Sequence, residues 1–174
     1  HAPGLTFVHV THDQEEAMTM ADAIAVMNRG RIEQLGPPTQ LYERPATAFV
    51  AGFLGVSNLL HGAVAGPGRV RLDTGDEIAA DAGSRTGRVA VGIRPEKIRL
   101  GPPGDGDSSL AGTVRETAYV GVATQYVVDT GAGTLIVYVQ NNGAALSLQP
   151  GAAATLSWSP HATFVVDPAQ EATA

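Results

Sequence analysis

The chain has 174 residues, 44% of them apolar and 16% charged, so it is long enough to bury a hydrophobic core as one or two domains. Its net charge of -6 argues against a nucleic-acid partner, which favours a basic face. The absence of cysteine excludes disulfides and thiolate zinc sites, and no apolar run approaches the roughly 20 residues that span a bilayer.

The first 57 residues are predicted to mix helices and strands. Asn28-Arg29-Gly30-Arg31 separates two apolar runs in the manner of a tight hairpin, in which Gly30 supplies a positive φ. Pro37-Pro38 favours a helix start, and that helix should end before Pro45. Patterning as a whole predicts strands at 5–10, 23–28 and 31–35, and helices at 13–20 and 47–54.

From residue 58 onwards the pattern is all-β, so we predict two domains, 1–57 and 58–174. Aromatic residues are few, whereas 21 glycines and 11 prolines favour short strands joined by turns. Strands are predicted within residues 69–72, 89–93, 125–128 and 134–139, and the glycine-rich segment 101–109 is predicted to be a loop between two halves.

The two halves of this β region form a weak internal repeat. Segment 91–100 corresponds to segment 156–165, which places Pro95 opposite Pro160. Because proline cannot donate to a strand ladder, each proline is expected at a corner where a strand changes direction. Two small barrels packed together are the predicted architecture, with a chance match between short β segments as the alternative to a repeat.

One histidine stands out as a candidate for chemistry. The apolar run Leu5 to Val10 predicts a buried strand, and Thr11-His12-Asp13 follows it directly before the predicted helix. A side chain at this point is well placed to meet a ligand at the edge of a sheet. An imidazole there can donate a hydrogen bond to such a ligand. Without further information, a histidine that merely ends a strand would be the simpler interpretation.

The order of segments resembles the ATPase subunits of ABC importers. The similarity covers residues 11–22, which contain His12, then 22–36, 37–45 and 49–55. Residues 58–174, with Ile93-Arg94-Pro95-Glu96, resemble the transport-associated oligonucleotide-fold module that follows the ATPase domain in many importers. The fold class is then an α+β remnant of an ABC ATPase domain followed by an all-β domain of oligonucleotide-fold-like barrels.

The resemblance implies a function for the intact subunit. His12 would be the switch histidine that reaches the γ-phosphate of ATP, both as catalytic and as cofactor-binding residue, with Mg²⁺ as the accompanying ion. The partners would be a second ATPase subunit, forming a homodimer, and membrane-spanning permease subunits. The location would be the cytoplasmic face of the inner membrane, as a peripheral protein. Segments 119–121, 139–141 and 156–160 most resemble the polyamine branch, although iron, phosphonate and sugar importers share much of the pattern.

Motifs that ATP hydrolysis requires do not occur in this sequence. There is no G-x-x-x-x-G-K-[ST] loop to hold phosphates, no Leu-Ser-Gly-Gly-Gln signature and no apolar strand that ends in Asp-Glu. We therefore interpret the chain as the C-terminal piece of a longer subunit, and we expect it to bind no cofactor and to be inactive as an ATPase by itself. A stand-alone ligand-binding or dimerisation module is the alternative.

Other candidate residues have simpler interpretations. Asp13, Glu15 and Glu16 complement the dipole of a helix start rather than form a metal site, and no metal is predicted. His9 is expected to pack within the sheet, and a metal pair of His61 with His161 is not favoured. Three further expectations concern the β region. Arg94 with Glu96 contacts a partner or forms a surface ion pair, Trp158 and Tyr126 belong to the core rather than to a pocket, and Asn141-Asn142-Gly143 forms a turn.

Truncation would have a physical consequence for the N-terminal part. The strand at 5–10 would normally lie inside a parallel sheet whose neighbours this sequence does not contain. Residues 1 to about 35 are therefore predicted to be disordered, to self-associate or to pair with another chain, because exposed strand edges and apolar faces favour contacts.

Overall fold

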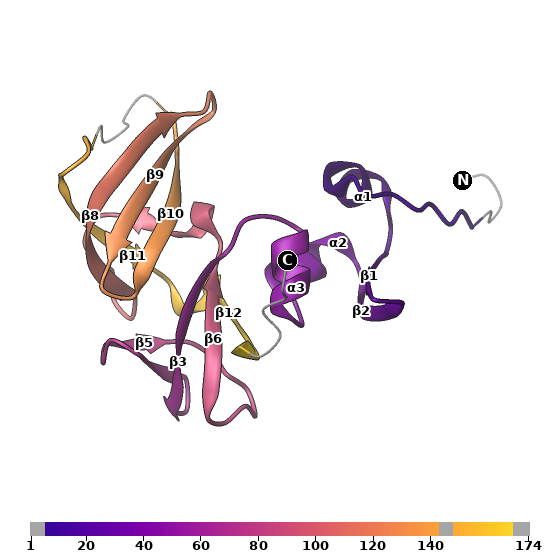
Figure 1. The fold of residues 1–174 in the computed structure, drawn as a ribbon, viewed down its shortest axis with the longest axis horizontal. Coiled ribbons are helices and arrows are strands. Elements are labelled where there is room, and N and C mark those ends of the chain that lie inside the picture. Colours follow the sequence, from indigo (N-terminus) through magenta and orange to yellow (C-terminus); the bar gives the residue numbers. More distant parts are fainter. Residues whose placement is uncertain (1–5, 143–147, 169–174) are drawn as a thin grey trace.

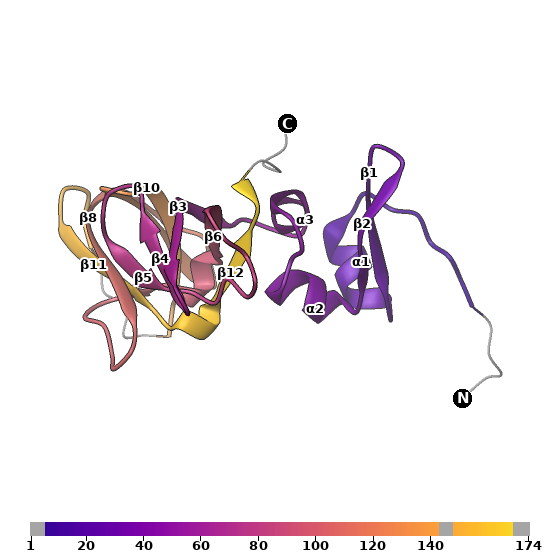
Figure 2. The ribbon, with the colours of Figure 1, turned by 90° about the horizontal axis from the view of Figure 1, so that it is seen from below.

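The computed structural model describes residues 6–142 and 148–168. A small N-terminal unit of helices and a hairpin lies beside a larger β domain, and its helix α3 (Ala48–Phe53) lies on the side that faces this domain (Figure 1). The view from below shows that the segment of residues 6–12 extends away from both (Figure 2). Within the described residues, no helix is long and apolar enough to cross a membrane.

The N-terminal unit consists of three short helices and one hairpin. Its elements are α1 (Gln14–Met20), β1 (Ile24–Asn28), β2 (Arg31–Gly36), α2 (Pro38–Glu43) and α3 (Ala48–Phe53). The predicted hairpin and helices are thus confirmed, and the turn contains Arg29 and Gly30 at φ values of 49° and 77°. A separate small core holds the unit together: Ile24, Val26, Leu41, Val50 and Leu54.

The predicted strand at 5–10 does not form over the described residues 6–10, and Leu5 lies outside the described residues. Residues 6–12 have no regular structure, and Phe7, Val8 and Val10 are 85%, 90% and 91% exposed. A central parallel strand needs neighbours on both sides to satisfy its backbone, and the described part of the chain provides none. Residues 1 to about 35 were predicted to be disordered, to self-associate or to pair with another chain. Disorder is wrong for β1 and for β2, because these two strands pair with each other. Self-association and pairing with another chain remain predictions.

The β domain contains two five-stranded antiparallel sheets. The first has the order β12-β6-β3-β4-β5 and the second the order β10-β9-β8-β11-β7. Strands of the first half are β3 (Asn58–Gly66), β4 (Arg69–Leu72), β5 (Glu77–Ala79), β6 (Arg88–Ile93) and β7 (Arg99–Leu100). Strands of the second half are β8 (Ser108–Tyr119), β9 (Ala123–Thr130), β10 (Gly133–Gln140), β11 (Ala153–Trp158) and β12 (Thr163–Val166).

The two halves exchange their last strands. After β6, the single-turn helix η1 (Pro95–Lys97) leads the chain into the second sheet, where β7 pairs with β11. After β11, the matching helix η2 (Pro160–Ala162) leads it back into the first sheet, where β12 pairs with β6. Both prolines therefore stand where the chain changes sheets, which confirms the predicted corners. Counted from the exchanged strand, the two sheets have equivalent strand orders: β12-β6-β3-β4-β5 in the first corresponds to β7-β11-β8-β9-β10 in the second.

One hydrophobic core fills the space between the two sheets, which curl into half-barrels (Figure 1). Trp158 and Tyr126 lie in this core at 0% and 1% exposure, as predicted. Equivalent glycines on the two long strands allow close strand packing. A Cβ on Gly62 would lie 2.3 Å from the backbone oxygen of Arg71, and one on Gly112 would lie 2.7 Å from that of Asp129.

Candidate functional site

His12 lies in an exposed segment directly before α1. The backbone N–H of Asp13 donates to Thr11 Oγ1 at 3.0 Å, and the Asp13 carboxylate accepts from the Glu16 N–H at 3.1 Å. Asp13 is thereby the N-cap of α1. His12 is held between two residues that are fixed by hydrogen bonds, while its own side chain faces solvent and has no partner among the described residues.

The acidic residues around His12 have structural roles. Glu15 and Glu16 occupy the first turn of α1, where negative charge complements the helix dipole, as predicted. The hydrogen bond with Thr11, followed by the one with His9, lowers the pKa of Glu16. His9 is not packed in a sheet as predicted, because the strand does not form; its Nε2 lies 3.2 Å from Glu16 Oε2. No group of three possible metal ligands is present within residues 6–142 and 148–168.

A second candidate region is the junction between the N-terminal unit and the β domain. Arg94, on the corner after β6, is 1% exposed and reaches across this junction. Its Nη1 donates to the backbone oxygen of Ala51 at 2.8 Å and to Ser57 Oγ at 2.7 Å. The same nitrogen donates to the backbone oxygen of Val56 at 3.3 Å, and Nη2 donates to that of Tyr42 at 3.0 Å. The sequence-based interpretation of Arg94 and Glu96 as a surface ion pair is therefore wrong, whereas a contact of this segment with a partner subunit remains a prediction.

The guanidinium of Arg94 is buried without a carboxylate. Its Cζ lies 4.1 Å from the centroid of the Tyr42 ring and 5.7 Å from that of Phe164, so aromatic faces supply part of its stabilisation. Within the described residues it forms no ion pair, and its Nε has no hydrogen-bond partner. Burial lowers the pKa of Arg94 from its ordinary high value. Because arginine stays protonated in proteins, this is a buried, charged side chain.

Two further contacts link η1 to α2 at the edge of the junction. The Tyr42 hydroxyl donates to Glu96 Oε1 at 2.7 Å, and Lys97 Nζ lies 3.0 Å from Glu43 Oε1. Burial, followed by the hydrogen bond with Glu96, raises the pKa of Tyr42 to about 12. Glu96 thus pairs across the junction with a tyrosine rather than with Arg94. The sequence contained Tyr42 and Glu96 but no signal that they meet, since 54 residues separate them.

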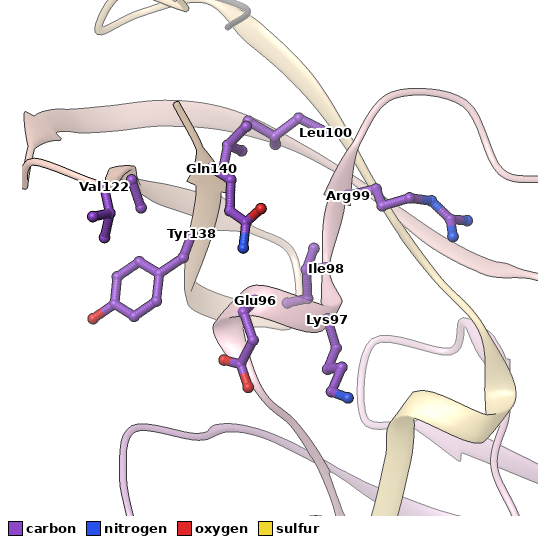
Figure 3. A pocket seen from close by; sticks show the side chains of 10 residues that line it. Glu96, Lys97, Ile98, Arg99, Leu100, Val122, Tyr138 and Gln140 are labelled. Carbon is purple, nitrogen blue, oxygen red and sulfur yellow. The ribbon is translucent and has the colours of Figure 1, made fainter. Parts of the chain in front are cut away.

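A groove of about 630 Å³ borders the same corner, between η1 with β7 and the ends of β9 and β10. Figure 3 shows Glu96 and Lys97 projecting from the same side of η1, while the Arg99 guanidinium points away from Gln140. Arg99 pairs with Asp107. The lining is mixed in character: Glu96, Lys97, Ile98, Arg99, Leu100, Val122, Ala123, Tyr138, Val139 and Gln140.

The remaining candidates do not form a site. His61 is on β3 and His161 is on η2, and neither belongs to a group of three or more possible metal ligands within the described residues. Trp158 and Tyr126 belong to the core. The proposed turn at residues 141–143 lies partly outside the described residues, which end at Asn142 before this gap.

Comparison with known proteins identifies related sequences for nearly the whole chain. A family model described as TOBE domain matches residues 91–166. The chain is 47% identical over 173 residues to the spermidine/putrescine import ATP-binding protein PotA of Thermobifida fusca, with 94% of this chain and 45% of that protein covered. It is 48% identical to the PotA protein of Acidothermus cellulolyticus, with 90% and 44% covered. The chain therefore spans less than half the length of these relatives.

A solved structure supports the fold of the β domain. The cytoplasmic molybdate-binding protein ModG superimposes with a TM-score of 0.55 at 21% identity, covering 64% of this chain and 96% of that protein. Similarity at this level concerns the fold alone. It confirms the predicted all-β, barrel-like domain, whose two halves are curled five-stranded half-barrels where two small barrels were predicted.

Proposed function

We propose, on the premise that this chain corresponds to the C-terminal region of spermidine/putrescine import ATP-binding proteins, that it forms the last part of the ATP-hydrolysing subunit of an ABC importer. The observation that carries the proposal is the extent of the match, since 94% of the chain aligns at 47% identity with one such protein. The β domain then follows the ATPase domain, whose final portion is the N-terminal unit.

In the intact subunit, His12 would contact the γ-phosphate of bound ATP. Its position on the backbone supports this role, because the Thr11 and Asp13 hydrogen bonds fix the chain on both sides of an exposed imidazole. ATP and Mg²⁺ would be held by residues that this sequence does not contain. The chain alone is expected to hydrolyse no ATP, because it has no phosphate-binding loop.

The further components follow from the same proposal. Two ATP-binding subunits would form a homodimer, and their closure on ATP would drive membrane-spanning permease subunits at the cytoplasmic face of the membrane. A polyamine is the proposed cargo, because the relatives named above are spermidine/putrescine import ATP-binding proteins. The cargo would pass through the permease and need not touch this chain.

The test compares the full gene product with the 174-residue chain. Intact mass identifies whether a longer subunit exists, and ATP hydrolysis is measured on each. In a longer, active subunit, His12→Ala should reduce hydrolysis by about 100-fold or more while ATP still binds. His161→Ala, a matched change at an exposed position of the β domain, should leave the rate unchanged. An unaltered rate in His12→Ala would overturn the role of His12. A gene product no longer than this chain would overturn the ATPase proposal and favour a stand-alone module.

A further inference from the structure

The corner that carries Arg94 does not itself require an arginine. Its equivalent at the other strand exchange is Ser159, and the two residues have nearly identical backbone angles, −70° and 141° against −71° and 144°. Each is followed by a proline and a single helical turn. Ser159 satisfies its own corner by accepting from the His161 N–H at 3.3 Å. The side chain of Arg94 makes no such local bond, and its hydrogen bonds go to residues across the junction.

The acceptors that Arg94 reaches belong to three successive segments. Tyr42 is in the last turn of α2, Ala51 is in the second half of α3, and Val56 with Ser57 forms the connection to β3. Carbonyl groups near helix ends lack partners within their own helices, so a buried donor has to supply them. A guanidinium can do this because it presents several N–H donors in one fixed plane.

Apolar contacts around the guanidinium bring the same parts together. Ala48 and Ala51 of α3 pack against Ala90, Phe164 and Val166 of the β domain. Small side chains on α3 allow this close approach. Alanine side chains interlock little with their neighbours, however, so these contacts do not define one orientation of α3 on the β domain. The directional bonds of Arg94 supply what the alanine contacts lack.

We propose that Arg94 is a positioning residue that fixes the orientation of the segment from α2 to Ser57 on the β domain. The same turn carries Glu96 and Lys97, which contact Tyr42 and Glu43 of α2 and also line the groove. The η1 turn therefore connects the groove mechanically with the N-terminal unit. This inference goes beyond the proposed function and does not depend on ATP hydrolysis.

The absence of native cysteine makes the orientation directly measurable. Cysteines introduced at Arg31 on β2 and Thr113 on β8, both exposed, give one label on each side of the junction. The distance distribution between two spin labels is recorded for this labelled parent and for Arg94→Ala, Arg94→Lys and Ser159→Ala. Emission of Trp158, the single tryptophan and fully buried in the β domain, reports whether that domain stays folded.

The parent and Ser159→Ala are expected to give the same narrow distribution. Arg94→Ala should shift and broaden it while Trp158 emission stays unchanged, and Arg94→Lys should give an intermediate result, since an ammonium cannot span the separated acceptors. An unchanged distribution in Arg94→Ala would overturn the proposal. Exposure of Trp158 in both Arg94 variants would also overturn it, because Arg94 would then serve the core of the β domain.

Discussion

Asn58 and Ile136 join the two sheets through a reciprocal pair of hydrogen bonds. The Asn58 amide donates to the backbone oxygen of Ile136 at 2.8 Å, and its Oδ1 accepts from the Ile136 N–H at 2.7 Å. Asn58 begins β3 and is 5% exposed, whereas Ile136 lies on β10 of the other sheet. A side chain thus takes the place of a strand along the edge of β10, and it satisfies both backbone groups of one residue.

Replacement of Asn58 by alanine should therefore destabilise the β domain. Two partly buried backbone groups would lose their partners, which should lower the free energy of unfolding by about 2–4 kcal/mol. Denaturant unfolding followed by Trp158 emission measures this. Asn141→Ala is the matched control, because Asn141 also makes two side-chain bonds but within one hairpin and partly exposed, where water can replace them. Equal losses in the two variants would contradict a special role for the Asn58 bridge.

Glycine at position 62 is required by the adjacent strand. A methyl group there would approach the Arg71 backbone oxygen to 2.3 Å, so Gly62→Ala should cost about 2–3 kcal/mol of unfolding free energy. Gly52→Ala provides the opposite expectation, because open space surrounds Gly52 within α3 and alanine favours a helix by about 0.5–1 kcal/mol. Calorimetry on both variants tests the pair. A Gly62→Ala protein as stable as the parent would show that β3 and β4 can separate without loss.

The Tyr42 phenol predicts a dependence of stability on pH. Its pKa in the folded protein is raised to about 12, against about 10 in an unfolded chain. A group whose pKa is raised on folding stabilises the protein fully below the unfolded value and loses that contribution as the pH rises through the folded one. Stability from Tyr42 should therefore be present at pH 8 and lost between about pH 10 and 12.

Denaturant unfolding of Tyr42→Phe at pH 8 and pH 11 measures this contribution. The variant should be less stable than the parent at pH 8, where it lacks the bond to Glu96, and the difference should narrow at pH 11. Tyr119→Phe is the control, since Tyr119 is 75% exposed, and it should match the parent at both pH values. A difference for Tyr42→Phe that stays constant from pH 8 to pH 11 would contradict the raised pKa.

Much of the fold was predictable from local pattern, whereas the contacts of the junction were not. Pro95 and Pro160 each follow an apolar strand, and this local signal was sufficient to place both corners. The partners of Arg94 lie 37–52 residues earlier in the chain, and most of them are backbone oxygens, which any residue type provides. An Arg-Pro pair at a strand end is compatible with an exposed or a buried arginine, so the sequence alone favoured the commoner exposed case.

In the N-terminal segment, the local sequence pattern predicted a strand that does not form. Leu5 to Val10 is a typical buried strand by composition, yet residues 6–10 are exposed because strand formation depends on neighbours rather than on the segment itself. His12 was selected from a family resemblance, and its geometry adds that the neighbouring backbone is fixed by Thr11 and Asp13. The sequence pattern indicates only a domain boundary at Asn58, although a polar residue at the start of a buried strand is compatible with a bridging role.

The last prediction concerns the cap that fixes the backbone beside His12. Asp13→Ala removes the acceptor for the Glu16 N–H, which should destabilise α1 by about 1 kcal/mol. Because α1 has only seven residues and none of them is buried, this loss should open its first turn without unfolding the β domain. Hydrogen exchange should accelerate at the Glu16 amide while Trp158 emission stays constant.

Gln14→Ala is the matched control, since it changes an exposed neighbour in the same turn and leaves the Asp13 carboxylate in place. Exchange at Glu16 should then remain as slow as in the parent. Equal acceleration in both variants would mean that any substitution in this turn opens the start of α1, and that the Asp13 carboxylate is not what caps the helix. Acceleration in Asp13→Ala alone would establish that the Asp13 carboxylate keeps the backbone next to His12 in one conformation.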